Sequence, residues 1–181
     1  MPVPTASASS KPKTANLAST APTAGTPLRV LLLSSQYDTG GQGWRMHRAF
    51  RRHEPEWEVR SMSKDRTYLD YPVDLPYRRS SLEEHYQRAD VIHARNRFDD
   101  YDRLAAKFGP KPVVLHVHGT LFRSDPNRFV RQARERHAPL IVSTLDLWTL
   151  AHESEWLPAP YDLDALMELR RAQRPDLQPG K

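Results

Sequence analysis

The sequence of 181 residues contains no cysteine. This absence excludes disulfide frameworks, thiolate metal sites and catalysis by a cysteine nucleophile. No apolar run approaches the roughly 18 residues that a membrane-spanning helix needs, and the N-terminus lacks the apolar core of a secretory signal. We therefore expect a soluble, cytoplasmic protein.

Several catalytic signatures are also missing. The chain has no G-x-S-x-G nucleophile elbow and no H-E-x-x-H zinc motif, and no carboxylate pair can be placed from the sequence. The glycine-rich turn at residues 40–43 matches neither the dinucleotide fingerprint nor a Walker loop. These absences argue against an ordinary hydrolase, a zinc peptidase and a P-loop nucleotidase.

Positive charge is in excess. The 27 Lys and Arg residues outnumber the 22 Asp and Glu residues, which gives a net charge of +5 and a pI near 9.6. This balance favours anionic partners, and nucleic acid, phosphorylated sugars and acidic lipid headgroups all qualify. Arg128, Arg131 and Arg134 recur along one side of a predicted helix. They form either a solvated outer face or a contact to nucleic acid.

The chain divides into three parts by composition. Residues 1–27 are rich in Ala, Ser, Thr and Pro, with Lys11 and Lys13 as the charged side chains. Such a segment buries too little apolar surface to offset the entropy of ordering it, so we predict a disordered tail. Residues 28–162 suffice for one ordinary domain, and residues 163–181 form a predicted C-terminal helix and tail.

The folded part alternates predicted strands with predicted helices. Alternation at this spacing indicates an α/β fold, a single Rossmann-like parallel sheet with helices on both faces. The predicted strands are 28–34, 57–62, 90–94, 113–117 and 139–143, and the predicted helices are 44–52, 80–88, 99–108, 126–137, 145–152 and 163–172.

Helix ends carry recognisable signals. Asp125 before Pro126 is a favourable N-cap with proline at the first helical position. Gly109 followed by proline stops the helix that precedes it. Ser80 and Glu83 have the spacing of a capping box.

Two of the predicted strands end in candidate binding residues. The run at 113–117 leads into His118, and the crevice beyond the carboxyl ends of parallel strands is where such folds bind ligands. The first strand leads into Gly40, Gly41 and Gly43, where backbone N–H groups before a helix can hold an anion. The alternatives are that His116 and His118 simply alternate across a strand, and that the glycines form a plain tight turn.

Five segments in order resemble the N-terminal domain of retaining GT-B glycosyltransferases, the group that includes glycogen synthase, sucrose synthase and bacterial mannosyltransferases. The resemblance spans residues 28–162. The matching segments are 28–43, 89–94, 111–120, 140–144 and 156–162.

The resemblance implies transfer of a sugar from a nucleotide-sugar donor to an acceptor that this domain binds. It implies no metal and no other cofactor. The residues implied in these contacts are Gly40, Gly41 and Gly43 at the donor phosphate, His118 as the catalytic residue at the transferring sugar, and Gly119 and Arg123 at the acceptor or sugar.

The sequence departs from the family in two ways. The family's donor-binding domain begins soon after a Pro-x-Pro-x-Asp motif, matched here by Pro158, Pro160 and Asp162, and few residues follow. We therefore expect a partner chain or a homodimer to supply that half. Asp38 would also repel a diphosphate unless it caps the following helix. The alternative is a non-catalytic Rossmann-like binding or interaction module for a nucleic acid or another anionic ligand.

Overall fold

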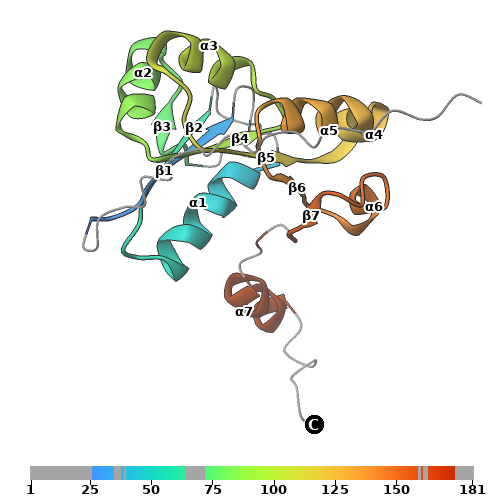
Figure 1. Cartoon of the computed structure of the whole chain (residues 1–181). Coiled ribbons are helices and arrows are strands. Elements are labelled where there is room, and N and C mark those ends of the chain that lie inside the picture. The colour runs from blue at the N-terminus through green and yellow to red at the C-terminus, as the bar shows by residue number, and fades with distance from the viewer. Residues whose placement is uncertain are drawn as a thin grey trace, which may run out of the picture.

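The structure, a computed structural model, describes residues 26–34, 38, 40–63, 72–158, 160 and 163–173. Nearly all of the predicted tail and Asp162 of the proline motif lie outside the described residues. The elements, drawn in Figure 1, are β1 Arg29–Ser34, α1 Gln42–His53, β2 Glu58–Ser63, β3 Leu75–Pro76, α2 Arg79–Arg88, β4 Val91–Arg95, α3 Asp99–Phe108, β5 Val113–Val117, α4 Gly119–Ser124, α5 Pro126–Glu135, β6 Leu140–Val142, α6 Leu145–Trp148, β7 Glu155–Trp156 and α7 Leu163–Gln173.

The described strands form one seven-stranded sheet in the order β3-β2-β1-β4-β5-β6-β7, with every pair parallel. The predicted α/β, Rossmann-like sheet is therefore confirmed. The chain leaves β1 toward β2 and β3, then returns to place β4 on the other side of β1. This reversal makes the carboxyl ends of β1 and β4 the switch point, where such sheets usually bind ligands.

The first strand is buried on both of its faces, which explains its uninterrupted apolar run. Leu31 and Leu33 belong to the larger core cluster, together with residues of α2, α3 and α5. Leu32 belongs to a smaller cluster with Met46 of α1 and Val59 of β2. In Figure 1, α1 accordingly covers one face of the sheet, and α2 and α3 lie on the other.

Two of the three predicted helix signals are confirmed. The Asp125 carboxylate accepts the Arg128 N–H at 3.0 Å, with proline at the start of α5. Gly109 follows α3 with a φ of 88°, a left-handed conformation that suits glycine. The capping box at Ser80 is wrong, because α2 begins at Arg79 without a side-chain cap. Glu83 instead lies 2.7 Å from the ammonium of Lys107 on α3.

Three short elements were not predicted. The strands β3 and β7 have two residues each, and α4 has six. The helix predicted at 145–152 ends early, at Trp148. No helix among the described residues is long and apolar enough to cross a bilayer.

Candidate functional site at the carboxyl edge

Polar side chains, all buried except the half-buried His118, gather near the carboxyl ends of the central strands. They fall into two adjoining groups. We name them the charged group, made of Ser34, Asp38 and Arg95, and the histidine chain, made of His93, His116, Ser143 and His118.

The charged group ties the start of α1 to the sheet. Arg95 Nη1 donates to Ser34 Oγ at 2.7 Å and to Asp38 Oδ1 at 2.8 Å. The Asp38 carboxylate also accepts the backbone N–H groups of Gly43 at 2.9 Å and Trp44 at 3.0 Å. Asp38 therefore caps α1, as a carboxylate at a helix N-terminus is expected to do.

The ion pair between Asp38 and Arg95 is buried, with each residue about 7% exposed. Burial by itself raises the pKa of Asp38, but the Arg95 charge and the Gly43 amide outweigh it, and the pKa is lowered overall. Burial lowers the pKa of Arg95, and Asp38 opposes that change. Both side chains are therefore ionised and compensate one another.

The glycine turn is closely packed against this pair. Gly41 has a φ of 64°, which favours glycine, and its N–H donates to the Asp38 carbonyl at 2.8 Å. A Cβ at Gly43 would lie 2.6 Å from Arg95 Nη1. Gly40 is exposed. Phosphate binding by these three glycines remains a prediction, and the amides of Gly43 and Trp44 already serve Asp38.

The histidine chain crosses three neighbouring strands. His93 Nε2 on β4 lies 3.1 Å from His116 Nδ1 on β5, and His116 Nε2 lies 3.1 Å from Ser143 Oγ after β6. Ser143 Oγ also bonds to His118 Nδ1. As predicted for two histidines on one face of a strand, the rings of His116 and His118 are neighbours, with centroids 4.4 Å apart, and His116 is the more deeply buried.

All three histidines are neutral near pH 7. Burial and the nearby Arg95 charge lower the pKa of His93 and of His118 to about 3. Burial and the neighbouring histidines lower the pKa of His116 further. A neutral imidazole has one N–H donor and one acceptor nitrogen. The Ser143 hydroxyl can donate to either His116 or His118, or it can accept from both rings and donate to the Val117 carbonyl at 3.3 Å.

One ring nitrogen of the histidine chain makes no hydrogen bond. This atom, His118 Nε2, is buried and has no partner among the described residues. If the Ser143 hydroxyl donates to His118 Nδ1, His118 Nε2 carries a hydrogen; if His118 Nδ1 donates to Ser143, His118 Nε2 carries a lone pair. In every arrangement this nitrogen has a hydrogen-bonding capacity that no described residue uses, and an unpaired buried polar atom calls for an explanation.

The backbone at His118 is held by β4. The His118 N–H donates to Asn96 Oδ1 at 2.7 Å, and Asn96 has a φ of 60°, a conformation that asparagine tolerates. This bond joins the carboxyl ends of β4 and β5, so His118 and the glycine turn lie at the same edge of the sheet. If His118 and the glycine turn lay at opposite edges of the sheet, they could not belong to one site.

The remaining predicted site residues are Gly119 and Arg123, which the resemblance implies at the acceptor or sugar. Gly119 begins α4 with a φ of 64°, and a Cβ added there would have nothing within 4 Å. Arg123 is exposed and pairs with Asp146 of α6 at 2.7 Å. Both assignments at the acceptor or sugar remain predictions.

The exposure of the arginines of α5 agrees with the interpretation that they form a solvated outer face. The side chains of Arg131 and Arg134 are 66% and 72% exposed. Arg134 pairs with Glu153, and Arg131 lies 4.0 Å from Glu135. Surface pairs of this kind contribute little energy.

Three residues at this edge were absent from the sequence prediction: Arg95, Asn96 and Ser143. The signal for the first two was their place directly after the strand predicted at 90–94. Among the described residues, no cluster of three or more His, Asp or Glu side chains is arranged to hold a metal ion.

A scan against protein-family models, a search of curated proteins and a search of solved structures each found no match.

Proposed function

We propose that this domain is the acceptor-side half of a GT-B-like glycosyltransferase, and that His118 Nε2 contacts a hydroxyl group of the transferring sugar. The observation that carries the proposal is the unpaired, neutral Nε2 atom at the mouth of a Rossmann-like sheet. The sheet and the five motifs support the same interpretation. A fold alone does not establish a function, so the proposal rests mainly on His118 Nε2.

A sugar hydroxyl suits His118 better than a phosphate does. A hydroxyl group both donates and accepts, so it satisfies His118 Nε2 whichever way the histidine chain is oriented. A phosphate oxygen can only accept unless it is protonated, and a neutral histidine gives it no charge. The low pKa of His118 therefore favours an uncharged, hydroxyl-bearing ligand.

The donor diphosphate needs stabilisation from elsewhere. Asp38 already occupies the amides of Gly43 and Trp44, and it balances the Arg95 charge. Stabilising a leaving diphosphate is the kind of electrostatic help that dominates catalysis. We propose that a second domain provides it, supplied by a partner chain or a second copy of this chain.

The first test is ligand binding, with UDP-glucose and GDP-mannose as donor probes and UDP and GDP as references. We expect at least one nucleotide-sugar to bind more tightly than its bare nucleotide and to shift the NMR signals of the His118 ring. His118→Ala should lower that affinity roughly five- to tenfold, the loss expected for one neutral hydrogen bond of about 1 to 1.4 kcal/mol.

His116→Ala is the matched control, because it removes the same kind of side chain two residues earlier. His116 is fully buried and bonded at both ring nitrogens, so its loss should cost about 2–4 kcal/mol of stability. If His118→Ala destabilises as much and leaves binding per folded molecule unchanged, His118 is a core histidine. The proposal also fails if neither probe binds in a sugar-dependent way.

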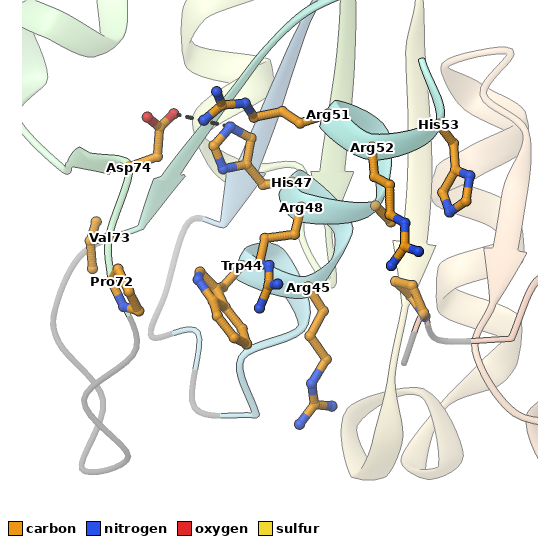
Figure 2. Close-up of a pocket in the computed structure, with 12 residues that line it drawn as sticks. Trp44, Arg45, His47, Arg48, Arg51, Arg52, His53, Pro72, Val73 and Asp74 are labelled. Carbon is orange, nitrogen blue, oxygen red and sulfur yellow. Dashed lines mark ion pairs between the residues drawn. The ribbon is translucent and has the colours of Figure 1, made fainter. Parts of the chain in front are cut away.

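A second candidate is a non-catalytic module that binds an anionic ligand. A cavity of about 670 Å³ along α1, lined by arginines and by residues separate from the histidine chain, favours it (Figure 2). The two functions differ in one readout: a module binds its ligand without glycosyl transfer, whatever second domain is added.

A further inference from the structure

Three buried side-chain atoms have no hydrogen-bond partner among the described residues. They are Gln42 Oε1, Asp100 Oδ2 and His118 Nε2. The Asp100 carboxylate is engaged through its other oxygen, which accepts from the Tyr77 hydroxyl at 2.8 Å. Gln42 is the first residue of α1. Its unpaired oxygen needs an explanation, as the unpaired nitrogen of His118 does.

The histidine chain lies on the face of the sheet that α1 covers. Ala94 of β4 belongs to the larger core cluster, on the face of α2 and α3. Side chains alternate along a strand, so His93 points to the other face. Phe50 of α1 confirms this, because the centre of its ring lies 6.4 Å from that of His93. Gln42 and the histidine chain are therefore on the same side of the sheet, whereas Asp100 belongs to α3 on the other.

Close contacts connect Gln42 to His118 through Arg95. Gly43, the residue after Gln42, is so near to Arg95 that an added Cβ would lie 2.6 Å from Arg95 Nη1. Asn96, the residue after Arg95, accepts the His118 N–H at 2.7 Å. Gln42 and His118 therefore flank Arg95 at the carboxyl edge of the sheet.

The two unpaired atoms at this edge belong to uncharged groups. The Gln42 amide has no charge, and its oxygen accepts hydrogen bonds. The His118 ring is neutral near pH 7, because burial and the nearby Arg95 charge lower its pKa to about 3. Arg95, between them, is compensated by Asp38 at 2.8 Å. A ligand at this edge thus meets neutral hydrogen-bonding groups, which suit hydroxyl groups better than a phosphate.

Unpaired buried polar atoms also make a site selective. A ligand hydroxyl that bonds to such an atom satisfies it, and an analogue without that hydroxyl leaves it unpaired. Sites built in this way discriminate strongly against a ligand that lacks one hydroxyl group. If Gln42 had only a structural role, a side chain of similar length without polar atoms would serve at least as well.

We infer that Gln42 is a specificity-determining residue of the sugar site, and that its Oε1 atom accepts a hydrogen bond from a second hydroxyl group of the sugar that His118 contacts. The inference rests on the proposed sugar site at His118 and narrows its ligand to sugars that retain both hydroxyl groups. The α1 cavity in Figure 2 is a separate feature, because neither Gln42 nor His118 is among the described residues that line it.

The first measurement is the affinity of Gln42→Met for the nucleotide-sugar that binds the parent protein, UDP-glucose or GDP-mannose. Methionine is unbranched and lacks the amide. We expect roughly five- to tenfold weaker binding, the loss of one neutral hydrogen bond. The melting temperature of the unliganded variant should equal or exceed that of the parent, because an unpaired buried oxygen is removed. Gln87→Met on α2, where Gln87 is exposed, is the matched control and should change the affinity by less than about twofold.

Monodeoxy analogues of the same nucleotide-sugar identify the contact. One analogue should bind the parent protein roughly five- to tenfold more weakly than the complete sugar, because it leaves Gln42 Oε1 unpaired. Gln42→Met should bind that analogue and the complete sugar within about twofold of each other, since the two losses concern one interaction. His118→Ala should still discriminate against that analogue, because the hydroxyl group at His118 is a different one.

Different results overturn the inference and the proposed function. Binding that His118→Ala weakens and Gln42→Met does not would overturn the inference alone, and so would weaker binding by Gln42→Met with unchanged discrimination against every analogue. A lower melting temperature with unchanged affinity per folded molecule would make Gln42 a structural residue. Absence of sugar-dependent binding in the parent protein would overturn the proposed function, and the inference with it. Gln42→Ala takes the place of Gln42→Met where the latter does not fold.

Discussion

The charged group and the histidine chain lie next to each other at the carboxyl edge, but they differ in how completely their hydrogen bonds close. In the charged group, Arg95 donates to Asp38 and Ser34, and both Asp38 oxygens are engaged. In the histidine chain, hydrogen bonds connect His93, His116, Ser143 and His118 in turn, and His118 Nε2 at the end has no partner among the described residues. The polar atoms of one group are paired, and the other group ends at an unpaired atom.

This difference separates a structural role from a binding role. A buried ion pair adds little net stability but is costly to break, so Asp38 and Arg95 fix where α1 begins relative to β4. A ligand that used the Asp38 site would have to displace a bonded carboxylate. A ligand at His118 would displace no protein partner, which is why we place the sugar there and not at the glycine turn.

Acidification should produce the largest effect, through the histidine chain. His93, His116 and His118 have lowered pKa values in the folded protein, so below their ordinary pKa near 6.5 the unfolded chain binds more protons. The stability is therefore complete above about pH 6.5 and falls as the pH drops toward 3. Each histidine contributes a slope of about 1.4 kcal/mol per pH unit, or about 4 for the three.

Urea unfolding at a series of pH values from 7.5 to 5 measures this slope. His116→Gln should reduce the slope by about one third, and His152→Gln at an exposed position is the control for losing a histidine. A stability that stays constant between pH 7 and 5 would mean that the three rings are already protonated or solvated in the folded protein.

Breaking the charged group should have the next largest effect. Asp38→Ala leaves Arg95 buried without its counter-ion and removes the acceptor of two amides, so we expect a loss of about 3–5 kcal/mol. Asp125→Ala is the matched control, because Asp125 also caps a helix but is exposed. Its loss should cost about 1 kcal/mol.

Urea denaturation compares the two variants, and Asp38→Asn serves where Asp38→Ala does not fold. Asparagine keeps an acceptor oxygen but removes the charge, so its effect isolates the ion pair. Equal losses of unfolding free energy for Asp38→Ala and Asp125→Ala would show that the ion pair between Asp38 and Arg95 adds nothing to the effect of helix capping.

The sequence predicted the fold well because its main signals are local. Apolar runs located β1 and β5 to within a residue, and Gly109 and Asp125 marked helix boundaries correctly. The strands β3 and β7 escaped prediction because two residues carry no periodicity. They exist through pairing with β2 and β6, which is a tertiary effect.

The candidate site was predicted only in part, for a related reason. His118 and the glycines stand out by position in a motif. Arg95 belongs to no motif, and its place after a predicted strand does not reveal its neighbours. Those follow from strand order: the register places Arg95 beside Ser34 on one side and His116 on the other. The pairing of Arg95 with Asp38 depends on that register, which a single sequence does not reveal.

The smallest expected change in stability concerns the glycine turn. It distinguishes a turn whose neighbouring space is filled by the charged group from a turn that is open to a ligand. Gly43→Ala would place a Cβ 2.6 Å from Arg95 Nη1, 3.1 Å from Asp38 Oδ2 and 3.3 Å from Ser34 Oγ. Overpacking of this kind costs about 1–3 kcal/mol. Gly40→Ala is the control, because its nearest contact would be Gln42 Cγ at 3.8 Å. It should be neutral or stabilise by up to about 1 kcal/mol, through the unfolded chain.

Melting curves of the two alanine variants, with nucleotide-sugar titrations of each, provide the measurement. We expect Gly43→Ala to lower stability while Gly40→Ala does not, because the charged group fills the space beside Gly43 and leaves Gly40 exposed. If Gly43→Ala is fully stable and instead weakens nucleotide-sugar binding, the turn is open and approaches the ligand. The predicted phosphate contact would then hold, and the charged group would share the binding role that we assign to His118.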